Sequence, residues 1–473
     1  MLKISVDAAA ASPVYRQIVE QVRSLVATGA MAPGYPMPTV RALAQELGVS
    51  RLTVHKAYQE LQKIGIVESR SRRGTVVVPI AEEDAGIDRL MSFVTKGPFA
   101  EFERICERMN VRSMASPVPD PRLFDVDQYL ACTQVLREDK SWSFYFPDEI
   151  ADHRLGRAFV AFARPYGLQF RANSVVPVSG VNPALTLLLP LFAPEGSTIA
   201  IQEPHSLNAA VRYHRHGYRA VGVPTASDGI DTRALEQACQ KEEPKAFVAA
   251  PNFGFGDGVR WSRTNRKRAA EILTRYGVKL IERTSMSVLA FDDDQPPLLS
   301  SLMPADLCAS EFSLQFCVAP GLHMSFVSVS PAGRLGLMRA VFRQGHALAK
   351  PQRLVLTEYF ESGSLQSNLV RIVREYRRRR EALCEVLSAS LPEECNFALP
   401  SGGFCVHVKT QEPVDGEELF RRALKSKTAV MPCRYLNSAG TGDGGVVLSY
   451  SMLGPAALQE AGSAFCRVLK SML

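Results

Sequence analysis

The spacing of apolar residues divides the chain into two regions with different patterns. Between residues 13 and 28, Ile18, Val22 and Leu25–Val26 recur at helical spacing, which predicts an amphipathic helix. From about residue 174 onward, short apolar runs alternate with helical segments, and the clearest runs lie within 174–182, 194–201, 246–250 and 279–281. Parallel strands that are buried on both faces have continuous apolar runs of this kind. The second region therefore predicts a mainly parallel, doubly wound sheet.

Two more short helices and a hairpin are expected after the first helix. Residues 38–41 begin a second helix that Gly48 ends, and Ser50 caps a third helix. The apolar side of the third helix consists of Val54, Ala57, Tyr58 and Leu61. Two short helices joined by a tight turn that contains glycine form a helix-turn-helix. Residues 65–78 follow as a β-hairpin with a basic tip, which gives the motif a wing.

The distribution of charge indicates what kind of partner the N-terminal module binds. The net charge is +7, and residues 1–80 contain ten Lys or Arg against five Asp or Glu, so this module contributes +5. A basic module on a nearly neutral body indicates a polyanion such as DNA. Arg51, at the start of the third helix, suits a guanine or phosphate contact. The residues predicted to contact DNA are Arg41, Ser50, Arg51, Thr53, His55, Lys56, Arg70, Arg72, Arg73 and Gly74. For any one of them, the alternative is a solvated basic face.

The N-terminal module resembles the winged helix of GntR-type regulators. The matching positions are Pro13, Tyr15, Gly29, Pro33–Gly34, Pro38–Arg41, Leu43–Ala44, Gly48–Arg51, Thr53–Val54, Ala57–Tyr58, Leu61, Gly65 and Gly74–Thr75. The later segments resemble the aminotransferase-like domain of MocR-type regulators. This resemblance implies an α/β chain in which a winged helix-turn-helix precedes a large fold-type I aminotransferase-like domain. That domain is expected to have a mainly parallel sheet and a smaller C-terminal α+β subdomain.

The resemblance also suggests where the domains begin and end. We expect the DNA-binding domain in residues 1–80, a partly helical linker in 81–116, and the aminotransferase-like domain in 117–473, with its small subdomain from about 360. The family further implies a homodimer, with domain swapping as one arrangement. Ten cysteines without a CxxC pair favour reduced thiols and no metal site. No apolar run is long enough for a membrane span, so we expect a cytoplasmic protein without a membrane partner.

The positions that hold pyridoxal phosphate in this family are changed here. The family's Schiff-base lysine falls on Phe316, which has no amine, and its ring-nitrogen carboxylate falls on Arg283. The other changed positions are Ser285 for a tyrosine, Gly254 or Phe255 for an amide, and His323 and Val447 for arginines. No lysine occurs between Lys279 and Lys350. We therefore expect no cofactor and no enzymatic activity.

Some polar groups in this region still fit a binding pocket. Ser179 and Gly180 precede a helix, which is a typical anion site, and Ser313 and Arg283 add polar groups. Arg283 is expected either to pair with Glu282 or Asp257, or to bind an acidic, partly apolar effector. Four consecutive arginines at 377–380 resemble a nucleic-acid patch, but on an amphipathic helix of this family they are interpreted as a solvated face.

The leading hypothesis is a transcription regulator that binds a double-stranded DNA operator. A second hypothesis is an aminotransferase-like enzyme or regulator that uses pyridoxal phosphate unconventionally. A third is an assembly protein with a vestigial DNA-binding module, against which Arg41, Arg51 and the complete wing argue.

Overall fold

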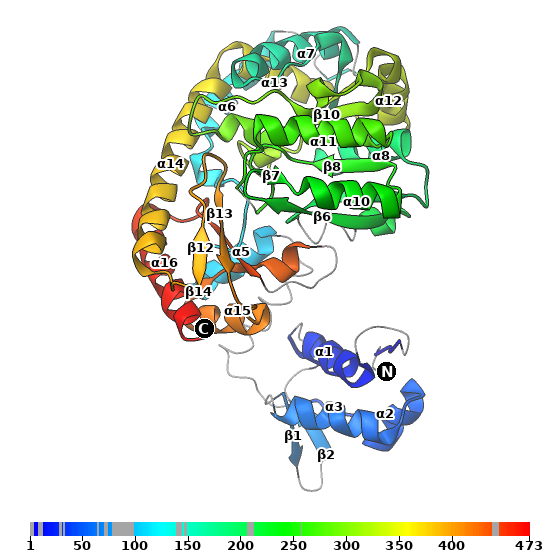
Figure 1. The fold of residues 1–473 in the computed structure, drawn as a ribbon, viewed down its shortest axis with the longest axis vertical. Helices are drawn as coiled ribbons and strands as arrows, with labels where there is room; N and C mark the ends of the chain where they lie inside the picture. Colours follow the sequence, from blue (N-terminus) through cyan, green and yellow to red (C-terminus); the bar gives the residue numbers. More distant parts are fainter. Residues whose placement is uncertain are drawn as a thin grey trace. The chain divides into compact units, whose positions relative to one another are not determined.

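The computed structural model describes residues 4–7, 13–27, 31, 34–63, 66–70, 74–77, 99–138, 144–145, 149–205, 212–256, 258–437 and 444–473. The chain divides into two compact units, residues 1–111 and 112–473 (Figure 1). Within the described residues, no helix combines the length and the apolar character that crossing a membrane requires.

The first unit contains the predicted helices and hairpin. Its elements are α1 (Val14–Ala27), α2 (Val40–Leu47), α3 (Arg51–Lys63), β1 (Val67–Arg70), β2 (Gly74–Val77) and α5 (Phe99–Arg108). Ile18 and Val22 of α1 pack with Leu43 of α2 and Val54 of α3 in one buried cluster. This packing confirms the helical spacing in the sequence. The first part of the predicted linker, residues 81–98, lies outside the described residues.

An eight-stranded sheet forms the centre of the second unit. Its strands, in spatial order, are β4 (Val175–Val178), β11 (Ser325–Val329), β10 (Cys308–Ser313), β9 (Lys279–Arg283), β8 (Ala246–Ala249), β5 (Thr198–Glu203), β6 (Arg219–Ala226) and β7 (Gly229–Ile230). The pairs from β10 to β6 are all parallel, whereas β11 and β7 run antiparallel to their neighbours. The predicted mainly parallel sheet is therefore confirmed.

Helices cover both faces of this sheet, as Figure 1 shows. Alternate strand residues face opposite sides: Ile199 and Ile201 pack with α8 (Val181–Phe192) and α12 (Pro331–Arg343). Ala200, which lies between them, packs with α10 (Thr232–Glu242) and α11 (Arg263–Arg275). This alternation buries both faces and explains why the strands are continuous apolar runs. Helix α8 begins at Val181, directly after Gly180, as the sequence predicts.

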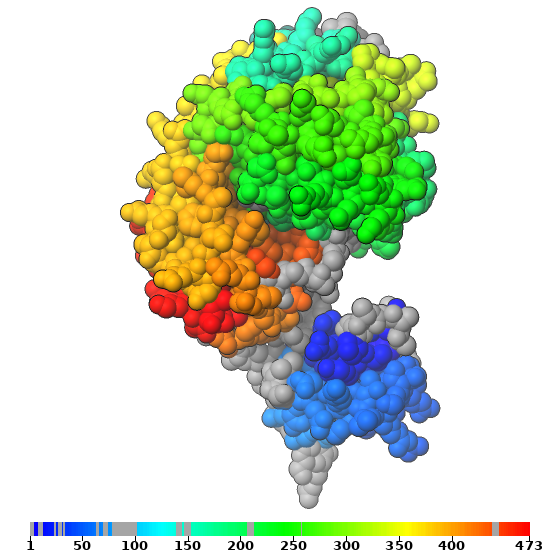
Figure 2. All heavy atoms as spheres, viewed as in Figure 1, coloured from blue at the N-terminus to red at the C-terminus, as the bar shows by residue number. Residues whose placement is uncertain are grey.

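The remaining elements form a small four-stranded sheet and the helices around it. The small sheet has the order β12 (Cys395–Phe397), β13 (Cys405–Thr410), β16 (Gly445–Ser449) and β15 (Met431–Pro432). The other elements are α6 (Val126–Ala131), α7 (Glu149–Ala163), α13 (Lys350–Glu361), α14 (Ser364–Ser390), α15 (Gly416–Lys425), α16 (Pro455–Lys470), β3 (Arg112–Ser113) and β14 (Thr428–Ala429). Helices α14 and α16 pack together and form one continuous surface, yellow to red in Figure 2.

The end of the predicted linker belongs to the second unit. Residues 112 and 113 form β3, which pairs in parallel with β14 at Thr428 and Ala429. This pairing connects a segment before the large sheet to the C-terminal part of the chain. The sequence did not indicate it, because two-residue strands have too little apolar pattern to be recognised.

Candidate nucleic-acid interface and a pocket in the second unit

Side-chain caps fix the turn between α2 and α3. The hydroxyl of Thr39 accepts a hydrogen bond from the backbone N–H of Ala42 at 3.1 Å and so caps α2. Gly48 ends α2 in the left-handed conformation, with φ at 65°, which a residue without Cβ adopts without strain. Ser50 Oγ then accepts from the backbone N–H of Thr53 at 3.1 Å. The predicted helix-turn-helix is therefore present, with the predicted cap at Ser50.

Helix α3 has one buried and one exposed face. The four predicted inward residues, Val54, Ala57, Tyr58 and Leu61, are all buried. Arg51, His55 and Lys56 are exposed on α3, as Arg41 is on α2 and Ser50 is before α3. Thr53 is less accessible than the other predicted contact residues of α3. It is half-buried, and its hydroxyl lies 2.8 Å from the capping hydroxyl of Ser50.

An aromatic ring of α1 positions one cation of α3. The ammonium nitrogen of Lys56 lies 4.2 Å from the ring centroid of Tyr15, a cation–π contact. Both residues belong to the predicted DNA-binding module, but sequence reasoning did not link them. The contact restrains the Lys56 side chain while it stays exposed.

The predicted wing is the antiparallel pair of β1 and β2. Its register places Val67 opposite Val77 and Arg70 opposite Gly74. Gly74 is exposed and has φ at 73°, so it allows the chain to turn back into β2. Arg72, Arg73 and the Arg70 side chain lie outside the described residues.

The second unit has a pocket where several changed cofactor positions meet. Its described lining is Pro117, Ala250, Phe253, Gly254, Phe255, Gly256, Gly258, Arg283, Ser285, Met286, Phe316, Gly403, Phe404 and Cys405. Arg283, Ser285 and Phe316 thus lie together, as the family resemblance implied. These described lining residues include no lysine, and phenylalanine rings provide much of the wall. The described lining residues supply neither the amine that the aldehyde of pyridoxal phosphate needs nor the carboxylate that its ring nitrogen needs.

Arg283 pairs with a residue that the sequence analysis missed. Its Nε lies 3.7 Å from Oε2 of Glu311, and its Cζ lies 5.0 Å from the ring centroid of Phe316. Glu311 is fully buried and accepts a hydrogen bond from Ser325 Oγ at 2.7 Å. Burial raises the pKa of Glu311, and the charge of Arg283 and the bond from Ser325 offset this only in part. The glutamate in the middle of β10, a strand that is buried along its whole length, was the signal that could have found it.

One of the two expected partners of Arg283, Glu282, was wrong. Glu282 points elsewhere, because its carboxylate accepts from the backbone N–H groups of Leu299 at 2.9 Å and Ser300 at 2.8 Å. Asp257, the other expected partner, lies outside the described residues. Arg283 also influences a second arginine: burial lowers the pKa of Arg212, and the charge of Arg283 lowers it further.

The other predicted pocket residues lie outside this lining. Ser313 is fully buried, and its hydroxyl donates to the carbonyl of Met324 at 2.9 Å. Gly180 precedes α8 with φ at 118°, and a Cβ there would lie 3.8 Å from Nδ1 of His323. Ser179 adjoins Gly180, and Val447 is buried in β16. The structure therefore brings together Gly180 and His323 at the start of α8, apart from the described lining around Arg283.

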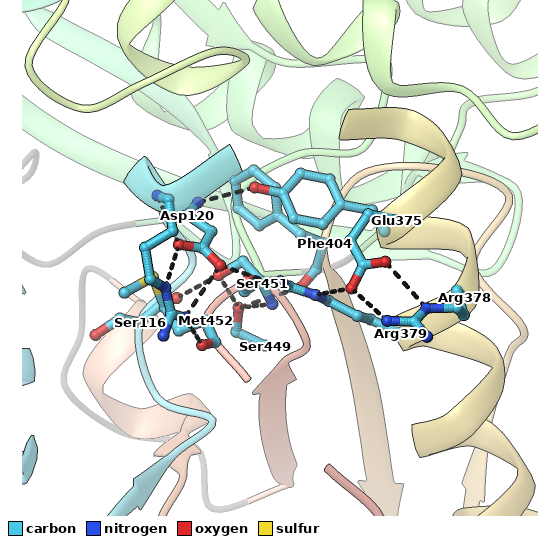
Figure 3. A network of polar contacts seen from close by, with 11 residues as sticks. Ser116, Asp120, Glu375, Arg378, Arg379, Phe404, Ser449, Ser451 and Met452 are labelled. Atoms are coloured by element: carbon cyan, nitrogen blue, oxygen red, sulfur yellow. Dashed lines mark hydrogen bonds and ion pairs between the residues drawn. The ribbon is translucent and has the colours of Figure 1, made fainter. Parts of the chain in front are cut away.

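A polar network connects the start of the second unit to α14 and the small sheet (Figure 3). Asp120 is fully buried, and Arg379 Nη1 lies 3.0 Å from its Oδ2. Arg379 also donates to Glu375 Oε1 at 2.9 Å and to the main-chain carbonyl of Ser451. The interpretation of residues 377–380 as a solvated face is therefore wrong for Arg379, whose side chain is 7% exposed, whereas that of Arg378 is 63% exposed.

Known proteins match both units. The family model of "Bacterial regulatory proteins, gntR family" matches residues 14–77. The 2-aminoadipate transaminase of Thermus thermophilus is 28% identical over 382 residues, which are 79% of this chain and 94% of that protein. The uncharacterized HTH-type transcriptional regulator YdcR of Escherichia coli is 26% identical, over 88% of this chain and 91% of its own length. The probable rhizopine catabolism regulatory protein MocR of Rhizobium meliloti is 22% identical over 95% of this chain and 92% of its own.

Among solved structures, LysN, the alpha-aminoadipate aminotransferase of Thermus thermophilus, aligns with a TM-score of 0.68. The two chains are 26% identical, and the match covers 77% of this chain and 93% of that chain. The chain therefore combines a GntR-type helix-turn-helix domain with an aminotransferase-like fold. Together with relatives named MocR and YdcR, this combination is consistent with the MocR-type subfamily of GntR regulators.

Proposed function

We propose that the chain is a transcription regulator that binds specific DNA operators and does not hold pyridoxal phosphate covalently. The capped helix α3, with Arg51, His55 and Lys56 exposed on it, carries this proposal. In a helix-turn-helix, the N-terminal residues of the second helix face base edges in the major groove. Arg51 is the first residue of α3, so its guanidinium suits a bidentate contact to guanine. Arg41, His55, Lys56 and the basic wing supply phosphate contacts.

The proposed regulator acts as a homodimer, in which two DNA-binding domains read two half-sites. The separation of such half-sites is about 10 base pairs or a multiple of it. A genome-wide map of the DNA bound by the full chain tests the proposal. We expect enrichment of one motif with two related halves at such a spacing. Binding spread over all sequences alike, or absent, contradicts the proposal.

Loss of covalent cofactor chemistry is supported by the pocket. Phe316 contributes a ring rather than an amine, and the guanidinium of Arg283 cannot accept the proton of a pyridinium nitrogen. Some relatives are named aminotransferases, so an enzyme remains the competing proposal. Trapping experiments, described in the Discussion, distinguish the two.

We further propose that the pocket binds an acidic, partly apolar effector. The side chain of Arg283 is 25% exposed and lines the pocket beside Phe316, Met286 and other apolar groups. Its Nε and Oε2 of Glu311 are both buried and lie too far apart, at 3.7 Å, for a direct hydrogen bond. A planar guanidinium in such a setting suits a carboxylate or phosphate, and the rings suit an apolar body.

A further inference from the structure

Leu52 lies on the proposed DNA-reading face, although it is a large apolar residue. Its exposed fraction is 77%, the highest among the large hydrophobic residues of the described chain. It is the second residue of α3, directly after Arg51. A leucine that stays exposed to solvent does not gain the free energy that burial of its side chain would give. If α3 enters the major groove, the exposed side chain of Leu52 can make an apolar contact with the DNA.

The position of Leu52 on the helix singles it out. The buried residues Val54, Ala57, Tyr58 and Leu61 define the inner face of α3. At about 100° per residue, Leu52 lies almost opposite the centre of that face. Helix α3 is anchored on its inner side, so Leu52 points most directly away from the domain. Its place in the first turn is also the place from which a recognition helix contacts base edges.

The neighbours of Leu52 make the surrounding surface polar and basic. Arg51, His55, Lys56 and Gln59 are all exposed on α3. Lys56, about one helical turn after Leu52, has its ammonium 4.2 Å from the Tyr15 ring centroid, which restrains its side chain. A helix face with one leucine among cations is better suited to bind DNA than to bind an apolar protein groove. The cations can contact the phosphates on either side of the major groove.

We infer that Leu52 reads a thymine by packing against its 5-methyl group in the major groove. That methyl is the one apolar group that bases present there, and it distinguishes thymine from the other three bases. This inference rests on the proposed function, because it needs the DNA-binding domain to read bases. Leu52 adds specificity for an A·T pair next to the base pair that Arg51 contacts.

Uracil substitution tests this contact, since uracil lacks only the methyl group. An operator is selected from random DNA with the full chain, and each thymine is replaced singly by deoxyuridine. We expect one position per half-site at which affinity falls about fourfold, as expected for losing one buried methyl-sized group, roughly 0.8 kcal/mol. Leu52→Ala should weaken binding to the thymine operator and lose the sensitivity to uracil at that position.

Two controls separate the outcomes. Leu335→Ala removes another exposed leucine, in the second unit, and should leave the uracil profile unchanged. The melting temperature of Leu52→Ala should match that of wild type, because the side chain is exposed. If wild type binds an operator but no uracil changes its affinity, or if Leu52→Ala keeps the wild-type profile, the inference is wrong while the proposed function stands. If wild type selects no operator, both are wrong.

Discussion

Arg283 and Glu311 are register partners on the neighbouring parallel strands β9 and β10, and their charged groups approach to 3.7 Å between Nε and Oε2. In this arrangement a buried carboxylate lies behind an arginine that lines a pocket. The carboxylate offsets the charge of Arg283, although the two atoms are too far apart for a direct hydrogen bond. The pair therefore places a cation at the wall of the pocket, with its counter-charge buried in the neighbouring strand.

The pKa of Glu311 leads to a pH-dependent prediction. Because its pKa is raised in the folded chain, folding favours the protonated carboxyl. The stability of wild type should then fall as the pH rises from the ordinary pKa of a glutamate through the raised pKa of Glu311. Glu311→Gln keeps a neutral group at every pH. Its melting temperature relative to wild type should increase over this pH interval.

Thermal melts at several pH values measure this difference. Glu385→Gln, at an exposed position of α14, serves as the matched control and should follow wild type. A Glu311→Gln variant whose relative stability falls as the pH rises would show that the ionised pair stabilises the fold.

Covalent capture of pyridoxal phosphate should not occur. The described pocket lining contains no lysine, and Phe316 occupies the position that the family resemblance assigns to the Schiff-base lysine. The protein is mixed with pyridoxal phosphate, reduced with borohydride and analysed by mass spectrometry. A lysine-bearing aminotransferase treated in parallel shows that trapping works. A stoichiometric adduct on a single lysine of this chain would show that the chain still forms an imine with pyridoxal phosphate.

Arg283 should control the response to an acidic effector. A ligand that binds only the folded chain stabilises it by about 2.7 kcal/mol at a concentration of 100 times Kd. A thermal-shift screen of acidic metabolites should therefore find a compound that raises the melting temperature of wild type and not of Arg283→Ala. Arg339→Ala, an exposed arginine of α12, is the control and should respond like wild type. An equal shift in Arg283→Ala would place the ligand elsewhere.

Two neighbouring arginines of α14 should differ strongly in their effect on stability. Arg379→Ala leaves Asp120 buried with less compensation, so we expect a loss of about 3 kcal/mol. Arg378→Ala removes an exposed partner of Glu375 and should change the free energy of unfolding by less than about 0.5 kcal/mol. Urea denaturation of both variants measures the contrast. Similar losses in the two variants would contradict the role of the buried network.

The stabilisation by the same network should decrease as the pH falls. Burial alone would raise the pKa of Asp120, but hydrogen bonds from Arg122 and Arg379 outweigh it and lower the pKa. The stabilisation is therefore present above the ordinary pKa of an aspartate and is lost as the pH falls through the lowered value. The difference in stability between wild type and Arg379→Ala should shrink over that acidic interval.

The sequence predicted features whose causes are local. The caps of α2 and α3 depend on Gly48, Ser50 and residues within a few positions of them, so the helix-turn-helix could be read directly. The parallel sheet could also be predicted, because burial on both faces leaves continuous apolar runs. These two features account for the architecture that the structure and the comparisons support.

Contacts between distant segments could not be read in this way. The Arg283–Glu311 pair depends on the register of two strands whose paired residues lie 28 positions apart in the chain, which no local pattern reveals. Arg379 looked like a member of a charged, solvated run, yet the approach of Asp120 from a segment 259 positions away buries it. Leu52 was passed over because an apolar residue in a helix is normally expected to face the core.

The affinity of the full chain for its selected operator, compared with a scrambled sequence, tests the central claim most directly. Wild type should prefer the operator, and Arg51→Ala should lose about 1–3 kcal/mol of that preference if Arg51 contacts a guanine. Arg137→Ala, an exposed arginine of the second unit, should keep the wild-type preference. Equal affinity of wild type for operator and scrambled DNA, or an Arg51→Ala variant that discriminates as well as wild type, would contradict the proposed reading of DNA by α3.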